Sequence, residues 1–269
     1  MPARLRRLVA LALATAVVVG ACSSDSNTAT TTSSASAAPS SGSSASGSIT
    51  VFAAASLTES FDEEQQTLKS EQPGLHITFN YGGSGSLVTQ IQQGAPADVI
   101  AAADTASMQR LVDAGLVETP QTFARNKLQI LVAPGNPKKI QGLSDLARSD
   151  VVFVTEDDSV PAGKYAAEVL QKANVTTNPV SEEADVKSAV AKITSGEADA
   201  TIVYLTDVTA AGSKGAGVTI PDDQNVVATY PIAVVKSAKD KAAARAFIDA
   251  LITGSGRDAL YKRGFLPPT

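Results

Sequence analysis

Four segments of the sequence place small or hydroxyl-bearing residues where an expected strand gives way to an expected helix. Ser56 follows three alanines in "VFAAASLTES", and Ser84 lies among glycines in "YGGSGSL". Ala162 opens a helix in "SVPAGKYA", and Val186 opens another in "EEADVKSAV". The first turn of a helix carries unpaired N–H groups and the positive end of the helix dipole, and small residues let a ligand come close to the backbone. Together with the serine hydroxyls, these segments predict a site for an anion.

Each segment also has a simpler interpretation. Ser56 and Glu59 have the S-x-x-E spacing of a capping box, so Ser56 alone is most simply a helix N-cap. The glycine–serine run around Ser84 is typical of a loop. Pro161 suits the first position of a helix, and Asp185 suits an N-cap. We interpret the segments as a site because they occur together and because such turns line up at the carboxyl ends of parallel strands, where ligands bind.

A serine hydrolase is the main alternative from another class of protein. Ser84 resembles the serine of a nucleophile elbow, but the G-x-S-x-G pattern requires a glycine where Ser86 stands. His76 is the only histidine, and its place on an expected strand makes it an exposed residue without an acidic partner. The sequence also lacks the P-loop, dinucleotide-binding and H-E-x-x-H motifs. We therefore expect a binding protein that is not an enzyme and has no cofactor.

Short apolar strands alternate with helices along the chain, which indicates an α/β fold. A first series has expected strands at residues 49–53, 75–80, 97–102 and 127–134. A second series has an expected strand at 151–155, helices from 161 and over 186–195, a strand at 200–205, an extended run at 225–236, and closing helices at 241–252 and around Leu260.

Two such series joined by long strands predict two lobes with two crossings between them. Lobe 1 would consist of residues 49–132 and 232–269, and lobe 2 of residues 133–231. This is the layout of a two-lobed solute-binding protein, in which the ligand lies in the cleft between the lobes.

The first 21 residues have the pattern of a signal peptide. Three arginines precede an apolar run at residues 8–19, which is short for a membrane span. The segment ends in V-G-A-C, and Cys22 is the only cysteine of the chain. This ending resembles a bacterial lipobox, which implies cleavage before Cys22 and a lipid on its sulfur. We therefore expect an extracytoplasmic lipoprotein anchored to the cell membrane.

The stretch that follows Cys22, up to residue 48, consists mainly of serine, threonine and alanine. With almost no apolar bulk to bury, it is expected to be a disordered tether. The whole chain has a net charge of −5, and loss of three arginines with the signal peptide brings the mature chain to about −8. This balance excludes nucleic acid as a partner, along with a basic surface for anionic membranes.

Several quoted segments together resemble a known family. "VFAAASLTE", "GSGSLVTQIQQGAPADVIAAAD", "VPAGKYA", "IVYLTD" and "YPIAVV" are similar to segments of the molybdate-binding proteins of bacterial ABC transporters, in the same order. The resemblance covers Ile49 to Phe265. It implies a type II fold like that of periplasmic binding proteins, with two hinge crossings and a mixed sheet flanked by helices in each lobe. It also implies an ABC permease and its ATPase as partners, and we expect a monomer.

The resemblance also implies which groups hold the oxyanion. In the family these are two serines, two backbone amides at helix starts and a tyrosine hydroxyl. Matched by motif, they are Ser56, Ser84, the amides of Ala162 and Val186, and Tyr204. Ser86 is the alternative register for the second serine. The alternative interpretation of Tyr204 is a core aromatic at the end of a strand.

The residue types at these five positions suit a tetrahedral dianion without a proton. None is a lysine or an arginine, so neutral donors would have to hold the charge. No carboxylate is expected among them, so the proton of phosphate would find no acceptor. Molybdate, tungstate and sulfate remain, and the protein would contact a metal only through the oxygens of the oxyanion. A choice between molybdate and sulfate depends on the size of the cavity, which the sequence does not give. Molybdate is the ligand that the resemblance implies.

Overall fold

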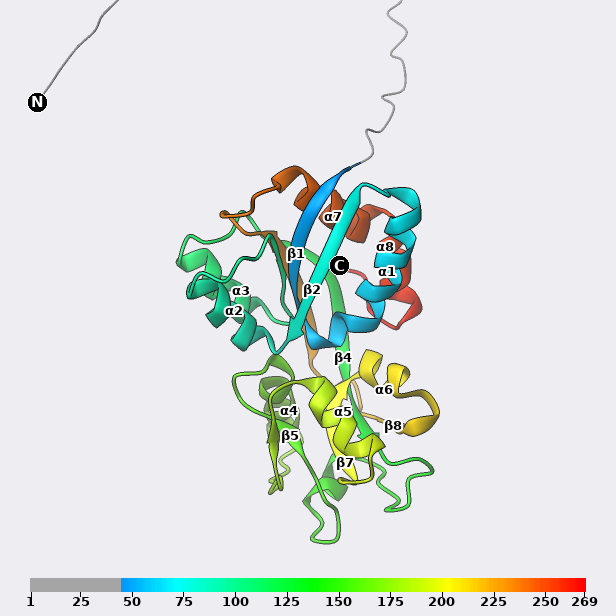
Figure 1. The fold of residues 1–269 in the computed structure, drawn as a ribbon. Coiled ribbons are helices and arrows are strands. Elements are labelled where there is room, and N and C mark those ends of the chain that lie inside the picture. The colour runs from blue at the N-terminus through cyan, green and yellow to red at the C-terminus, as the bar shows by residue number, and fades with distance from the viewer. Residues whose placement is uncertain (1–44) are drawn as a thin grey trace, which may run out of the picture. The chain divides into compact units, whose positions relative to one another are not determined.

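The computed structural model describes residues 45–269 of the chain (Figure 1). The expected signal peptide, Cys22 and most of the expected tether lie outside the described residues. Strand β1 begins at Gly47, two residues earlier than expected, because Gly47 and Ser48 pair with Leu75 and His76. None of the helices within residues 45–269 combines the length and the apolarity needed to span a membrane.

Seven strands form one mixed sheet in the order β2-β1-β3-β9-β4-β7, and β8 pairs with β4 outside this path. Strands β1, β2 and β3 are parallel, whereas β9 is antiparallel to β3 and β4, and β4 is antiparallel to β7 and β8. The strands of this sheet are β1 (Gly47–Ala54), β2 (Leu75–Gly82), β3 (Val99–Ala101), β4 (Gln121–Val132), β7 (Ala200–Tyr204), β8 (Ala216–Thr219) and β9 (Val227–Val234). A second, two-stranded sheet pairs β5 (Thr155–Glu156) with β6 (Glu182–Glu183).

Helices flank these strands, with three short 3₁₀ turns between them. The α-helices are α1 (Thr58–Glu71), α2 (Ser84–Gln92), α3 (Thr105–Asp113), α4 (Pro161–Lys172), α5 (Val186–Thr194), α6 (Leu205–Ala211), α7 (Lys241–Thr253) and α8 (Ser255–Lys262). The 3₁₀ turns are η1 (Ala55–Leu57), η2 (Leu143–Ala147) and η3 (Gly212–Lys214).

The apolar spacing of α1 determines how the helix packs. Phe61 and Leu68 are fully buried, as their spacing predicts. The Phe61 ring meets Phe79 of β2 at 5.8 Å and Phe247 of α7 edge-on at 5.6 Å between ring centroids. Helix α8 covers another part of α1, where Arg263 pairs with Glu63 at 2.8 Å. The last helices of the chain therefore complete the core that its first strand and helix begin.

Strands β4 and β9 connect two groups of elements. The first half of β4 pairs with β9, and its second half, residues 128–132, pairs with β7 and β8. The end of β9 pairs with β3. In Figure 1, β1, β2, α1, α7 and α8 lie on one side of this connection, and α4, α5, α6 and β7 lie on the other. The chain thus has the two-lobed α/β architecture, with two strands running between the lobes.

One expected strand did not form as predicted. The expected strand at residues 151–155 is irregular up to Thr155, although Phe153 makes an isolated parallel bridge with Ala200. Phe153 and Val154 are nonetheless buried, so the apolar run correctly indicated a core segment but not a regular ladder.

Candidate anion-binding site

A small pocket brings together all five residues predicted for the anion. Its walls come from the ends of strands and the starts of helices on both sides of the β4–β9 connection. The lining residues are Ala54, Ala55, Ser56, Gly82, Gly83, Ser84, Ala103, Val160, Pro161, Ala162, Asp185, Val186 and Tyr204. Most of these side chains are small, so much of the wall is backbone.

Helices α2, α4 and α5 begin at this pocket. Pro161 occupies the first turn of α4, as predicted. The carboxylate of Asp185 accepts a hydrogen bond from the Ser188 amide at 2.9 Å, which confirms Asp185 as the N-cap of α5. The backbone amides of Ala162 and Val186 have no hydrogen-bond partner among the described residues. Two helix starts therefore present free N–H groups and the positive ends of their dipoles to the pocket.

The capping-box prediction for Ser56 is wrong. Ser56 lies inside η1, α1 begins two residues later at Thr58, and no side chain caps either element. The Ser56 hydroxyl instead lies 2.9 Å from the hydroxyl of Tyr230 on β9, and both residues are buried. Glu59, the other half of the expected box, pairs with Lys187. Ser56 is thus free of a capping role and faces the pocket.

Ser84 is the second serine of the pocket. It is fully buried, and its hydroxyl oxygen accepts a hydrogen bond from the Ala103 amide at 3.0 Å. A backbone N–H can only donate a hydrogen bond, so the Ser84 hydroxyl proton remains available for the pocket. Ser86, the alternative register, is exposed, accepts from Gln90 at 3.3 Å and does not line the pocket.

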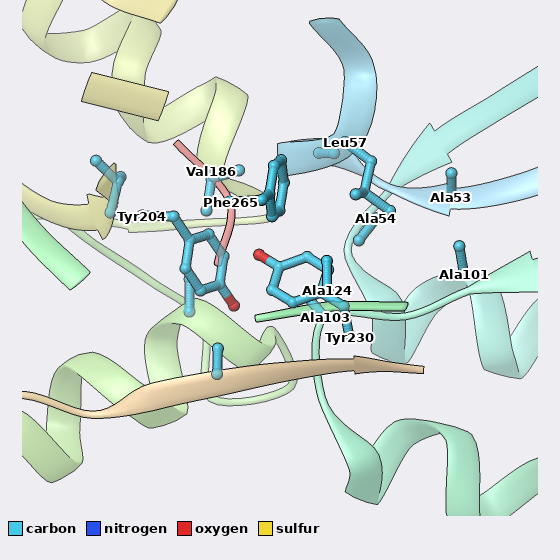
Figure 2. Close-up of a cluster of buried hydrophobic side chains, with 14 of the residues drawn as sticks. Ala53, Ala54, Leu57, Ala101, Ala103, Ala124, Val186, Tyr204, Tyr230 and Phe265 are labelled. Carbon is cyan, nitrogen blue, oxygen red and sulfur yellow. The ribbon is translucent and has the colours of Figure 1, made fainter. Parts of the chain in front are cut away.

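Tyr204 is both a core aromatic and a pocket residue. Its ring is 1% exposed and packs edge-on against Tyr230 at 5.6 Å (Figure 2). Its hydroxyl has no hydrogen-bond partner within the described part of the chain. Burial raises the pKa of Tyr204 well above its ordinary value, so the hydroxyl stays a neutral donor at physiological pH. A buried donor without a partner is costly, and a ligand oxygen in the pocket would satisfy it.

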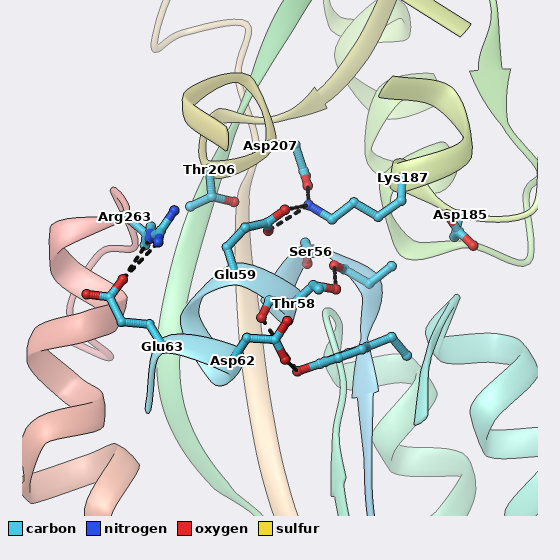
Figure 3. Close-up of polar contacts among 12 residues, drawn as sticks. Ser56, Thr58, Glu59, Asp62, Glu63, Asp185, Lys187, Thr206, Asp207 and Arg263 are labelled. Carbon is cyan, nitrogen blue, oxygen red and sulfur yellow. Dashed lines mark hydrogen bonds and ion pairs between the residues drawn. The ribbon is translucent and has the colours of Figure 1, made fainter. Parts of the chain in front are cut away.

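An ion-pair cluster that the sequence did not predict lies beside the pocket. Lys187, next to Val186 in the first turn of α5, places its Nζ 2.7 Å from Glu59 of α1 and 3.0 Å from Asp207 of α6 (Figure 3). Burial lowers the pKa of Lys187, but Asp207 and Glu59 outweigh that effect and raise it above its ordinary value. The nearby cation is therefore already neutralised, and the groups left to hold an anion are dipoles.

The same region buries acidic groups that would repel an anion if they were charged. Burial raises the pKa of Glu156 well above its ordinary value, and both of its carboxyl oxygens lack partners among the described residues. Burial also raises the pKa of Asp207 to about 6, against the lowering effect of Lys187. Glu156 is thus held neutral and Asp207 is paired, which limits the negative potential near the pocket.

Two glycines let the two sides of the pocket approach backbone to backbone. A Cβ atom on Gly83 would lie 2.7 Å from the carbonyl oxygen of Ala184, and one on Gly85 would lie 2.4 Å from that of Ser159. Both distances are shorter than side chains tolerate, so the observed approach requires glycine at both positions. These glycines belong to the start of α2, whereas Ser159 and Ala184 precede α4 and α5.

The sequence alone does not identify three residues that lie around the pocket. Ala103 follows the third strand in "ADVIAAAD", and its small side chain at a strand end is the signal that would have found it. Tyr230 and Lys187 carry no such signal, because their partners are distant in the sequence. His76 is exposed on β2 and does not line the pocket. Within residues 45–269, no group of three or more acidic, histidine or cysteine side chains is placed to hold a metal ion directly.

Comparison with protein families and known sequences points to one kind of protein. Residues 49–266 match the model of a family described as bacterial extracellular solute-binding protein. The chain is 40% identical over 222 residues to the molybdate-binding protein ModA of Mycobacterium tuberculosis, covering 82% of this chain and 85% of that protein. It is 28% identical over 223 residues to a putative ABC transporter substrate-binding lipoprotein, YvgL, of Bacillus subtilis, covering 81% and 86%.

Solved structures with the same fold include receptors for two oxyanions. A substrate-binding domain of a putative molybdenum ABC transporter from Clostridium difficile is 31% identical, with a TM-score of 0.61 over 82% of this chain and 98% of that one. The periplasmic molybdate-binding protein of Azotobacter vinelandii has a TM-score of 0.71 at 23% identity, over 82% and 100%. The sulfate-binding protein SubI of M. tuberculosis has the same TM-score and identity, over 82% and 86%. The fold alone therefore does not distinguish molybdate from sulfate.

Proposed function

Because the chain belongs to the bacterial extracellular solute-binding proteins, we propose that it binds molybdate in the pocket described above and delivers it to an ABC permease. The observation that carries this proposal is the convergence of neutral donors on one small pocket, in a chain 40% identical to a molybdate-binding protein. The relatives are solute-binding proteins, so this protein is a binding protein and not an enzyme. Tungstate, with the same charge and shape, is a second ligand of the same site.

Five groups are proposed to hold the oxyanion. They are the hydroxyls of Ser56, Ser84 and Tyr204 and the backbone amides of Ala162 and Val186. All five line the pocket, and hydrogen bonds to a charged acceptor contribute about 1.5–3 kcal/mol each. The metal of the oxyanion is reached only through its oxygens. The proposed lobes are residues 49–132 with 232–269, and residues 133–231.

The donor set favours an anion that carries no proton. Asp185 is the one acidic residue among those that line the pocket, and its carboxylate caps α5 by accepting from the Ser188 amide. Protonated phosphate would need an acceptor that the proposed donors do not offer. Sulfate is the second candidate ligand, because a sulfate-binding protein shares the fold at the same TM-score as a molybdate-binding one.

A thermal unfolding screen with molybdate, tungstate, sulfate and phosphate tests the ligand. We expect molybdate and tungstate at 100 times their Kd to stabilise the domain by about 2.7 kcal/mol, which raises Tm by roughly 5–10 °C for a domain of this size. Sulfate should act only at much higher concentration, and phosphate should have no effect. A larger shift with sulfate than with molybdate would reassign the receptor, and no shift with any of the four would refute the proposed function.

We also propose that the protein acts as a monomer held to the outer face of the membrane by a lipid on Cys22, with a permease and its ATPase as partners. The V-G-A-C ending supports the anchor, and one relative is itself described as an ABC transporter substrate-binding lipoprotein.

Membrane fractionation of cells tests the lipid anchor, and molybdate uptake by the same cells tests the permease as partner. We expect Cys22→Ser to remove the lipid and to leave molybdate binding by the purified domain unchanged. In cells that lack the permease, the wild-type protein should stay on the membrane but should no longer support molybdate uptake. A lipidated Cys22→Ser protein would overturn the anchor, and full uptake without the permease would overturn the partner.

A further inference from the structure

Tyr230 lies directly behind one of the proposed ligand groups. Its hydroxyl is 2.9 Å from the Ser56 hydroxyl, but Tyr230 itself is fully buried and does not line the pocket. Its ring is held by edge-on contacts with Phe123 at 6.3 Å, Tyr204 at 5.6 Å and Phe265 at 5.3 Å between centroids. The hydroxyl is therefore presented to Ser56 from a rigid position.

The direction of the hydrogen bond between the two hydroxyls decides what Ser56 can do. Either oxygen can be the donor at this distance. A serine hydroxyl has one proton, so a Ser56 that donates to Tyr230 has none left for a ligand. A Ser56 that accepts from Tyr230 keeps its proton free for the pocket. Only the second arrangement makes Ser56 a donor to an anion.

The second serine of the pocket already has this arrangement. The Ser84 hydroxyl accepts from the Ala103 amide, which can only donate, so the Ser84 proton is directed elsewhere. Tyr230 would play for Ser56 the part that the Ala103 amide plays for Ser84. Each serine would then have a donor behind it and an anion oxygen in front, and every proton would have an acceptor.

We propose that Tyr230 is a positioning residue for the bound anion. Its hydroxyl donates a hydrogen bond to Ser56, so Ser56 directs its own hydroxyl proton into the pocket. This inference rests on the proposed function of the same site. Chains of hydrogen bonds polarise one another, so the Tyr230 bond also strengthens the bond from Ser56 to the ligand.

The protonation state of Tyr230 agrees with this role. Burial raises the pKa of Tyr230 well above its ordinary value. The buried acid Asp207 raises the pKa further. The hydroxyl therefore retains its proton throughout the physiological pH range.

A double-mutant cycle between Tyr230→Phe and Ser56→Ala tests the role, with molybdate Kd measured by calorimetric titration. In the wild-type background we expect Tyr230→Phe to weaken binding about 2- to 10-fold, because it deletes a donor that acts through Ser56. In the Ser56→Ala background the same change should alter Kd less than about 2-fold, since the group through which Tyr230 acts is gone.

Tyr81→Phe is the matched control. Tyr81 donates its hydroxyl to Asp62 at 2.8 Å and does not line the pocket, so its loss should leave Kd unchanged in both backgrounds. Equal weakening by Tyr230→Phe in both backgrounds would show a structural effect of the ring and overturn the inference, as would no weakening in either. Wild-type protein that fails to bind molybdate would instead refute the proposed function, so the two failures are distinguishable.

Discussion

We expect Ser56→Ala and Tyr204→Phe each to weaken molybdate binding about 10- to 150-fold. Each change deletes one hydroxyl donor to a buried dianion and keeps the backbone, and such a bond contributes about 1.5–3 kcal/mol. The Tyr204 hydroxyl has no other partner among the described residues, so its loss costs the unliganded protein little. Ser56 caps no helix, so its replacement does not carry the cost of a lost cap.

Calorimetric titration with molybdate, alongside denaturant unfolding of the unliganded protein, separates affinity from stability. Ser86→Ala is the matched control, because this serine lies two residues from Ser84 but is exposed and outside the pocket. It should leave Kd unchanged. If both Ser56→Ala and Tyr204→Phe kept wild-type affinity, neither hydroxyl would belong to the site.

We expect Gly85→Ala to weaken molybdate binding about 5- to 150-fold, although it adds a single methyl group and removes none of the proposed donors. The new Cβ would lie 2.4 Å from the Ser159 carbonyl oxygen, and relieving such overpacking costs typically 1–3 kcal/mol. The two sides of the pocket would have to stay farther apart, so the donors of α4 could not converge with those of the first lobe. Because that separation relieves the clash, the unliganded protein should retain its stability.

Titration calorimetry gives the change in affinity, and small-angle X-ray scattering with saturating molybdate compares the compactness of the variant with that of the wild type. Gly142→Ala is the control, since nothing lies within 4 Å of its Cβ position and its backbone is extended. A Gly85→Ala protein with wild-type affinity and wild-type compaction would show that the close approach is not required for binding.

Local patterns in the sequence predicted most elements that carry the fold. The helical spacing of Phe61 and Leu68 corresponds to their burial on one face of α1. The alternation in β2 corresponds to a buried Leu75 and half-buried Ile77 and Phe79. Strand β8 was missed because its residues, Ala216–Thr219, include a glycine and pair with β4 over 80 residues away. The apolar run at residues 151–155 predicts a strand that does not form as a regular ladder, because an apolar run indicates burial more reliably than strand pairing.

The candidate site was predictable where backbone groups form it. Small residues before helices at Ser84, Ala162 and Val186 indicate helix starts, and helix starts indicate free amides. The partners of these groups were not predictable, because they are side chains brought together by the fold. Tyr230 is 174 residues from Ser56, and Lys187 is 128 from Glu59. The spacing of apolar residues within one segment does not indicate which distant residues its side chains contact.

The return of the chain's end to its beginning determines the order in which the protein can fold. β3 pairs with β9, α1 packs against α8, and the Leu266 amide bonds the Arg125 carbonyl oxygen at 2.7 Å. As long as β9, α7 and α8 have not emerged, the rest of the polypeptide has an unpaired edge at β3 and an uncovered apolar face on α1. Contacts over so long a loop form late, because loop closure must come first. For an extracellular protein threaded through a membrane from its amino end, the core of the first lobe closes only once the last residues have crossed.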